Sequence, residues 1–175
     1  TNTVKAIKDY YYESLSGIYS HSEITVLLEI VFEHFLNYSK IEVKTKEQNR
    51  LSESELLLFH FTLKRLKTFE PIQYILEEAP FYGMLFKVSS SVLIPRPETE
   101  ELVEWVIETV QDWPEPAHRH YKILDVGTGS GCIAIALRKN LPLNIETWAC
   151  DINDQVLTTA RRNAGYHEAL VDFVP

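Results

Sequence analysis

Cysteines, basic residues and long apolar runs are all scarce in this 175-residue sequence. Its two cysteines, Cys132 and Cys150, each lie in an apolar stretch, which favours two small buried side chains in a reducing compartment over a disulfide framework. No apolar run approaches the roughly 18 residues that span a bilayer, and the first residues hold no signal-peptide core. The cysteines and histidines lack zinc-ligand spacing. We therefore expect a cytoplasmic protein without a membrane span or a bound metal.

Positive charge is also in deficit. The chain carries 17 lysines and arginines against 25 aspartates and glutamates, a formal net charge of −8, and neither half has a basic excess. Binding to a phosphate backbone is therefore not expected, and nucleic acid is not among the predicted direct partners. Apolar residues at 45% and charged residues at 24% are typical of a globular protein.

Glycine is missing between Gly17 and Gly83, and the residues of that stretch have helical periodicity. Apolar side chains recur at helical spacing over 26–35 and again over 56–66. Ser22 is a candidate N-cap for the first of these helices, and the segment "LSESE" is a cap-like start for the second. The sequence predicts a helical N-terminal domain over residues 1–78.

The pattern changes from Pro80 onwards. The segment "FYGMLFKVSSSVLIP" has aromatic and β-branched residues on both sides of a serine-rich turn, which predicts a β-hairpin linker over residues 79–95. Pro97 suits the first position of a following helix, whose first turn is acidic. The segment "QDWPEPAHRHY", residues 111–121, is then a polar loop that contains proline.

Strand and helix patterns alternate after that loop. Apolar runs at 121–126, 145–151 and 170–174 are separated by helical patterns at 131–140 and 153–165. This order is typical of the first half of a doubly wound parallel sheet. The predicted fold class is α/β: a helical bundle, a hairpin linker, and over residues 96–175 the N-terminal half of a Rossmann-like domain.

The segment "DVGTGSG" follows the first of these strands and predicts a ligand-binding loop. Gly127, Gly129 and Gly131 have G-x-G-x-G spacing, whereas a dinucleotide fingerprint would place its third glycine or alanine at Cys132. Asp125 stands two residues before the first glycine, where a carboxylate disfavours a pyrophosphate and favours a cationic ligand. S-adenosylmethionine carries an ammonium and a sulfonium group and no phosphate, so the loop favours it.

Asp151 ends the second strand, 20 residues beyond Gly131, where a carboxylate can accept hydrogen bonds from both ribose hydroxyls of a nucleoside. NAD and S-adenosylmethionine share that feature, so Asp151 does not discriminate between them. The predicted cofactor-binding residues are Asp125, Gly127, Thr128, Gly129, Ser130, Gly131 and Asp151.

Three segments together resemble a known family. "VLIPRPETEELVEWV", "ILDVGTGSGCIAIAL" and "DINDQVLTTARRNA" are similar to the HemK/PrmC family, the protein-(glutamine-N5) methyltransferases of peptide chain release factors. The preceding "EPIQYILEEAPFYGMLFKVSSSVLIPRPETE" matches the hairpin that joins the domains in that family. The resemblance implies methyl transfer from S-adenosylmethionine to the glutamine side-chain nitrogen in the Gly-Gly-Gln loop of a release factor. It also implies that the helical domain recognises that factor.

The resemblance also assigns residues. By position, Gly127 to Gly131 would line the methionine and adenosine parts of the cofactor, and Asp151 would hold its ribose. Arg96, Glu98 and Thr99 fall in the family segment near the pocket mouth. Two prolines and an acidic first turn also make a good helix start, so both interpretations of these three residues stay open.

The sequence departs from the family at one motif. Asn-Pro-Pro-Tyr, which the family has after its fourth strand, does not occur in these 175 residues, so no catalytic residue is assigned. We expect the sequence to be part of a longer protein that is a monomer when intact, and to be inactive by itself. The alternatives are a methyltransferase of another substrate class, a non-catalytic protein-binding module and, third, an NAD-dependent oxidoreductase.

Overall fold

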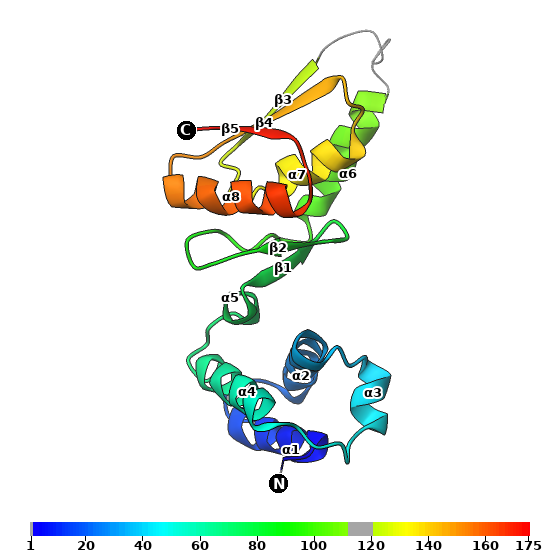
Figure 1. Ribbon diagram of the computed structural model, residues 1–175, viewed down its shortest axis with the longest axis vertical. Helices are drawn as coiled ribbons and strands as arrows, with labels where there is room; N and C mark the ends of the chain where they lie inside the picture. The colour runs from blue at the N-terminus through cyan, green and yellow to red at the C-terminus, as the bar shows by residue number, and fades with distance from the viewer. Residues whose placement is uncertain (1, 112–120) are drawn as a thin grey trace. The chain divides into compact units, whose positions relative to one another are not determined.

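The computed structural model describes residues 2–111 and 121–175 and divides the chain into two compact units, Thr1–Leu76 and Glu77–Pro175 (Figure 1). Most of the loop predicted at 111–121 therefore lies outside the described residues. None of the helices within the two described ranges has the length and apolar character needed to cross a membrane.

The first unit is helical. Thr3 caps its first helix, and serines cap α2 (His21–Leu36), α3 (Lys40–Thr45) and α4 (Glu53–Leu66). In these last three helices, the capping serine and a glutamate three residues later bond reciprocally to each other's backbone. The predicted cap Ser22 is wrong, because Ser20 accepts from the Glu23 N–H while the Glu23 carboxylate accepts from the Ser20 N–H. The helices are α1 (Val4–Leu15), α2 (His21–Leu36), α3 (Lys40–Thr45), α4 (Glu53–Leu66) and α5 (Ile72–Leu76).

Aromatic side chains fill the centre of this unit. Tyr11, Phe32 and Phe59 are fully buried, and the Tyr11 hydroxyl donates to the Phe59 carbonyl over 2.7 Å. Near the end of α4, the Arg65 guanidinium donates both to the Glu70 carboxylate and to the Ile75 carbonyl. The short helix α5 is thereby fixed to α4.

The second unit begins with a hairpin of β1 (Glu78–Phe81) and β2 (Met84–Lys87). Its turn consists of Tyr82 and Gly83, whose φ angles of 48° and 69° suit the two-residue turns that match the twist of a hairpin. The prediction of a serine-rich turn is wrong in position: the serines 89–91 follow β2, because the left-handed pair is Tyr82–Gly83.

A three-stranded parallel sheet follows, in the order β3 (Tyr121–Val126), β4 (Ile145–Cys150), β5 (Val171–Val174). The register aligns Ile123 of β3 with Thr147 of β4, and Thr147 with Val171 of β5. The predicted helical region, hairpin and parallel α/β sheet are confirmed.

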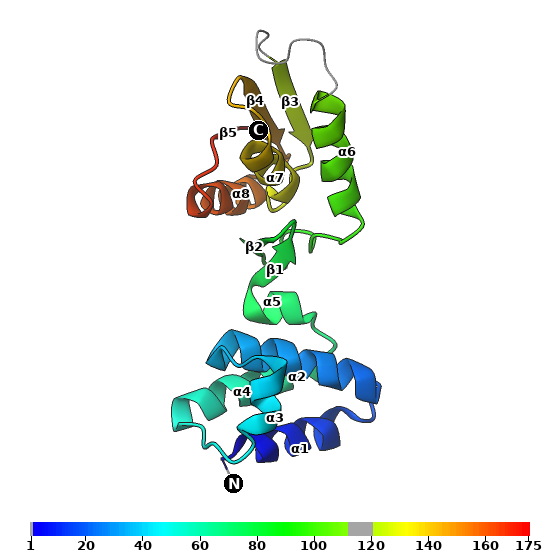
Figure 2. The same ribbon diagram turned by 90° about the vertical axis from the view of Figure 1, so that its right-hand side faces the viewer.

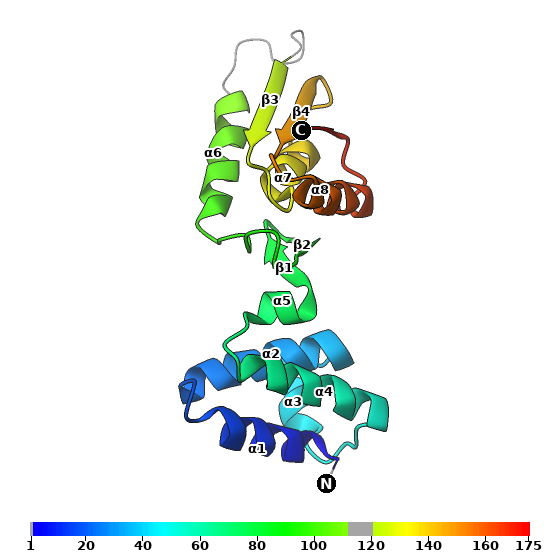
Figure 3. The same cartoon turned by 90° about the vertical axis from the view of Figure 1, so that its left-hand side faces the viewer.

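The helices of this unit are α6 (Thr99–Gln111), α7 (Cys132–Asn140) and α8 (Asp154–Tyr166). Helix α7 contacts both α6 and α8, and the views from either side show α6 running beside β3 (Figures 2 and 3). Pro97 is not the first residue of α6: it lies in a turn whose Arg96 and Pro97 carbonyls accept from the N–H groups of Thr99 and Glu100.

Candidate functional site

The glycine loop joins the carboxyl end of β3 to α7. Gly127, Gly129 and Gly131 have φ angles of 76°, 57° and 81°, a left-handed conformation that residues with a Cβ rarely adopt. A Cβ at Gly127 or Gly129 would meet no atom within 4 Å, so the loop is open there to an approaching molecule. A Cβ at Gly131 would come within 3.1 Å of the Ile135 side chain and 3.2 Å of the Ala160 Cβ. The first two glycines therefore leave space, and the third permits close helix packing.

The end of β4 holds this loop from one side. The N–H groups of Gly127 and Thr128 both donate to the Cys150 carbonyl, over 2.9 and 3.0 Å. The N–H of Gly129 donates to Oδ2 of Asp151 over 3.2 Å. The carboxyl ends of the neighbouring parallel strands β3 and β4 therefore meet at one site, which is where ligands bind in open α/β sheets.

Two carboxylates flank the loop. Asp125 is half-buried, and its Oδ2 accepts from the Thr128 hydroxyl over 2.7 Å. Burial raises the pKa of Asp125 above its ordinary value and the Asp151 charge raises it further, while hydrogen bonds from the Thr128 hydroxyl and the Ala134 N–H act in the opposite direction. A cationic group near both carboxylates would relieve this repulsion.

The side chains of Thr128 and Ser130, which were also predicted to bind the cofactor, lie at the loop but face the protein. Thr128 and Ser130 are both buried, and Thr128 uses its hydroxyl on Asp125. Asp151 is half-buried and also accepts from the Asn153 N–H through Oδ1, over 3.1 Å. Each carboxylate oxygen has further lone pairs, so Asp151 can still accept from a ligand hydroxyl.

Arg96, Glu98 and Thr99 lie in the turn that leads into α6 and at its first residue. Arg96 and Glu98 are exposed, Thr99 is half-buried, and the Thr99 N–H donates to the Arg96 carbonyl. This geometry supports the helix-start interpretation. A role at the pocket mouth stays a prediction.

Asn163 on α8 contacts the glycine loop, and it was not predicted from the sequence as a site residue. Its side chain is fully buried and donates to the Ser130 carbonyl within the glycine loop over 2.8 Å. The available signal was an asparagine one turn after Ala160, on the apolar face of a predicted helix, where a polar side chain needs a buried partner.

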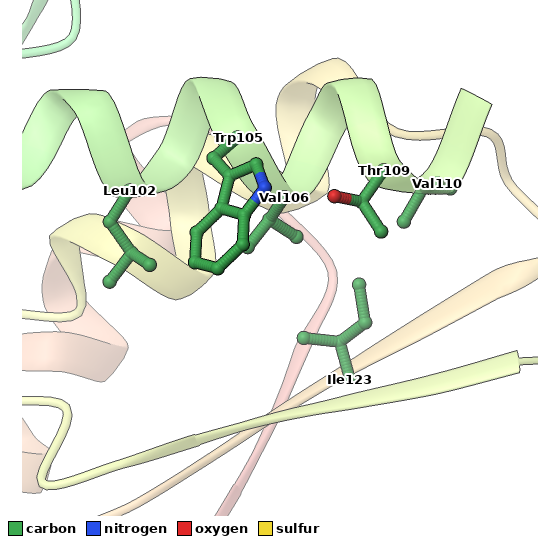
Figure 4. Close-up of a pocket in the computed structure, with 6 residues that line it drawn as sticks. All are labelled: Leu102, Trp105, Val106, Thr109, Val110 and Ile123. Carbon is green, nitrogen blue, oxygen red and sulfur yellow. The ribbon is translucent and has the colours of Figure 1, made fainter. Parts of the chain in front are cut away.

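A separate apolar pocket of about 270 Å³ lies between α6 and β3 (Figure 4). Among the described residues that line it, only Thr109 has a polar side-chain oxygen and none is acidic, so this lining does not suit a cationic nucleoside. The glycine loop is therefore the candidate cofactor site. The pocket is lined by Leu102, Trp105, Val106, Thr109, Val110 and Ile123.

The chain is similar to known proteins along most of its length. Residues 10–76 match the family model described as the PrmC N-terminal domain. The chain is 40% identical to the release factor glutamine methyltransferase of Flavobacterium psychrophilum over 171 residues, which cover 98% of the chain and 59% of that protein. It is 38% identical to the enzyme of the same name from Bacteroides thetaiotaomicron over 168 residues, which cover 95% of the chain and 57% of that protein.

The chain thus spans less than two thirds of the length of these relatives. Among solved structures, the N-terminal domain of human METTL16 in complex with SAH aligns with a TM-score of 0.45 and 18% identity, covering 82% of this chain and 51% of that one. The resemblance to the HemK/PrmC family is confirmed: the chain is similar to release factor glutamine methyltransferases over nearly all of its length, and residues 10–76 of its first unit match the PrmC N-terminal domain.

Proposed function

We propose that the glycine loop binds S-adenosylmethionine and that the protein serves to methylate the glutamine side-chain nitrogen in the Gly-Gly-Gln loop of release factors. The observation that carries the cofactor assignment is the pair of carboxylates, Asp125 and Asp151, beside a loop that is open at Gly127 and Gly129. The names of the relatives support the substrate.

The residues present fit this cofactor. Gly127 and Gly129 leave room for a ligand against the backbone, and Asp151 offers its remaining lone pairs to the ribose hydroxyls. Asp125 would supply negative charge that favours the cationic amino and sulfonium groups, and it would repel a pyrophosphate. Bound S-adenosylmethionine supplies an electrophilic methyl group, and the role of these residues is to hold and orient it.

The two units divide the work in this proposal. The helical domain, with the boundary predicted at residue 78, recognises the release factor, and the hairpin joins it to the cofactor-binding unit. The protein is cytoplasmic and monomeric. No catalytic residue is assigned, because the sequence holds no Asn-Pro-Pro-Tyr motif.

Calorimetric titration of the chain with S-adenosylhomocysteine and with NAD tests the cofactor assignment. We expect S-adenosylhomocysteine to bind and NAD not to bind, because Asp125 and Asp151 beside the loop would repel the pyrophosphate of NAD. Binding of NAD at equal or higher affinity would show that the site takes a dinucleotide.

Titration with a purified release factor, with S-adenosylhomocysteine present, tests the substrate separately from turnover. We expect the factor to bind, and a factor with alanine in place of the Gly-Gly-Gln glutamine to bind more weakly. Equal affinity for both would contradict recognition of that glutamine.

A further inference from the structure

Asn163 of α8 has hydrogen bonds that the cofactor chemistry described above does not use. Its side chain is 0% exposed. Its amide oxygen accepts from the Lys87 N–H over 2.8 Å, and its amide nitrogen donates to the Lys87 and Ser130 carbonyls over 2.9 and 2.8 Å. Lys87 ends β2, and Ser130 lies between two glycines of the loop. One side chain therefore joins the hairpin, α8 and the glycine loop.

These three hydrogen bonds determine how the amide of Asn163 is oriented. Both of its N–H donors point at carbonyl oxygens, and its oxygen faces an N–H group. A rotation of the amide by half a turn would oppose its oxygen to two carbonyls and its nitrogen to the Lys87 N–H. An aspartate of the same size would offer no donors when ionised, and a leucine would offer neither donor nor acceptor. Asparagine is therefore the side chain that satisfies all three backbone groups.

The packing of α8 against the loop supports the same role. Ala160 lies one turn before Asn163, and its Cβ and Cα would be 3.2 and 3.3 Å from a Cβ at Gly131. On the β4 side, Asp151 accepts from the Gly129 N–H. The loop is thus held by Asp151, which directly follows β4, and by Asn163 and Ala160 of α8.

A second contact between α8 and the hairpin provides a natural comparison. His167, which caps α8, donates through Nε2 to the Leu85 carbonyl of β2 over 2.9 Å, and its ring lies against Phe86. These contacts of His167 are with the hairpin. Loss of His167 should therefore loosen the hairpin and leave the loop in place.

We propose that Asn163 is a positioning residue that sets the glycine loop in its ligand-binding conformation and couples it to the hairpin. It fixes the Ser130 peptide between the two left-handed glycines, so the open face at Gly129 keeps its shape. The expected effect on cofactor affinity rests on the proposed function. Because coupling between sites is reciprocal, occupation of the loop should also slow exchange of the Lys87 amide hydrogen.

The test compares amide hydrogen exchange and S-adenosylhomocysteine affinity in the full chain, for the native protein, Asn163→Ala and His167→Ala. We expect Asn163→Ala to speed exchange in both the hairpin and the glycine loop and to weaken binding by about 10-fold or more. We expect His167→Ala to speed exchange in the hairpin alone, with affinity within about twofold of the native value. If Asn163 had a purely structural role, Asn163→Ala would lower the stability of the protein, but the two variants would not differ in glycine-loop exchange and S-adenosylhomocysteine affinity.

Unchanged exchange of the glycine loop in Asn163→Ala would overturn the proposal, and so would an equal loss of affinity in His167→Ala. If Asn163→Ala does not fold, Asn163→Asp replaces it, because it keeps the size and the acceptor for the Lys87 N–H while removing the donors. Failure of the native protein to bind S-adenosylhomocysteine would count against the proposed function, and the exchange of the loop would still decide the role of Asn163.

Discussion

At the scale of single residues, the three glycines of the loop serve two different purposes. All three adopt positive φ, so a side chain at any of them strains the backbone. A Cβ at Gly129 would occupy open space, whereas one at Gly131 would press on Ile135 and Ala160. Their substitution should therefore affect different properties of the protein.

The matched pair Gly129→Ala and Gly131→Ala separates these purposes. We expect Gly129→Ala to weaken S-adenosylhomocysteine binding by about 10-fold or more, with a loss of unfolding free energy of about 1 kcal/mol from the backbone alone. We expect Gly131→Ala to cost about 2 kcal/mol or more, because overpacking adds to the same strain. Urea unfolding and calorimetry measure the two quantities. Equal effects of both substitutions on stability would contradict the packing argument.

Asp151 has two tasks at the residue scale, since it accepts from the Gly129 N–H and is proposed to hold the ribose. We expect Asp151→Ala to weaken S-adenosylhomocysteine binding by about 10- to 100-fold, as two charge-assisted hydrogen bonds are lost and water replaces them in part. Asp172→Ala, on the exposed side of β5, is the control for the change in charge. An affinity unchanged by Asp151→Ala would place the ribose elsewhere.

At the scale of secondary-structure elements, the short helix α3 depends on its ends. Ser39 and Glu42 form a capping box, and Lys46 donates to the Glu42 carboxylate over 2.7 Å. The hydrogen bonds from Lys46 and Ser39 lower the pKa of Glu42 from 4.5 to about 2. A helix of 6 residues has little stability of its own, so the capping box at its start and the Lys46 contact at its end stabilise it.

The depressed pKa of Glu42 predicts a dependence of stability on acid. The folded pKa of about 2 is below the ordinary value of 4.5, so the stabilisation is complete above pH 4.5 and is lost as the pH falls towards 2. We expect the melting temperature, followed by circular dichroism, to fall between pH 6 and pH 3, and to fall less in Glu42→Gln. The same acid dependence in both proteins would show that the carboxylate does not stabilise the cap.

At the scale of the whole molecule, the two units are proposed to bind different partners. The proposed cofactor residues all belong to Glu77–Pro175, while α4 of the first unit exposes apolar side chains one turn apart, Leu57 at 54% and Phe61 at 57%. Exposed neighbouring apolar residues are typical of protein-binding surfaces. They are candidates for contact with a release factor.

Phe61→Ser tests whether this surface is used. We expect it to weaken release-factor binding by about 10-fold through the loss of buried apolar area, and to leave S-adenosylhomocysteine affinity unchanged. Ile41→Ser on α3, where the side chain is 73% exposed, is the matched control. If Ile41→Ser weakened release-factor binding and Phe61→Ser left it unchanged, recognition would be assigned to another face of the unit.

Local signals explain what could be predicted. The parallel strands were recognisable from short apolar runs, and the glycine loop from the spacing of Gly127, Gly129 and Gly131, because these patterns depend on residues close together in the chain. The misplaced hairpin turn and the cap at Ser22 were local errors. Several nearby polar or small residues suited the hairpin turn and the N-cap of α2. The backbone geometry places Gly83 in the turn and Ser20 at the cap.

The sequence by itself therefore determined the order of the elements and the position of the loop between β3 and α7, and it is the basis for proposing a cationic nucleoside rather than a dinucleotide as the ligand of that loop. Only the tertiary structure decided which groups hold that loop. Asp151 meets the Gly129 N–H across 22 residues, and Asn163 meets Ser130 across 33 and Lys87 across 76. Such pairs leave no periodic pattern, because each forms only when strands and helices distant in the chain have packed together.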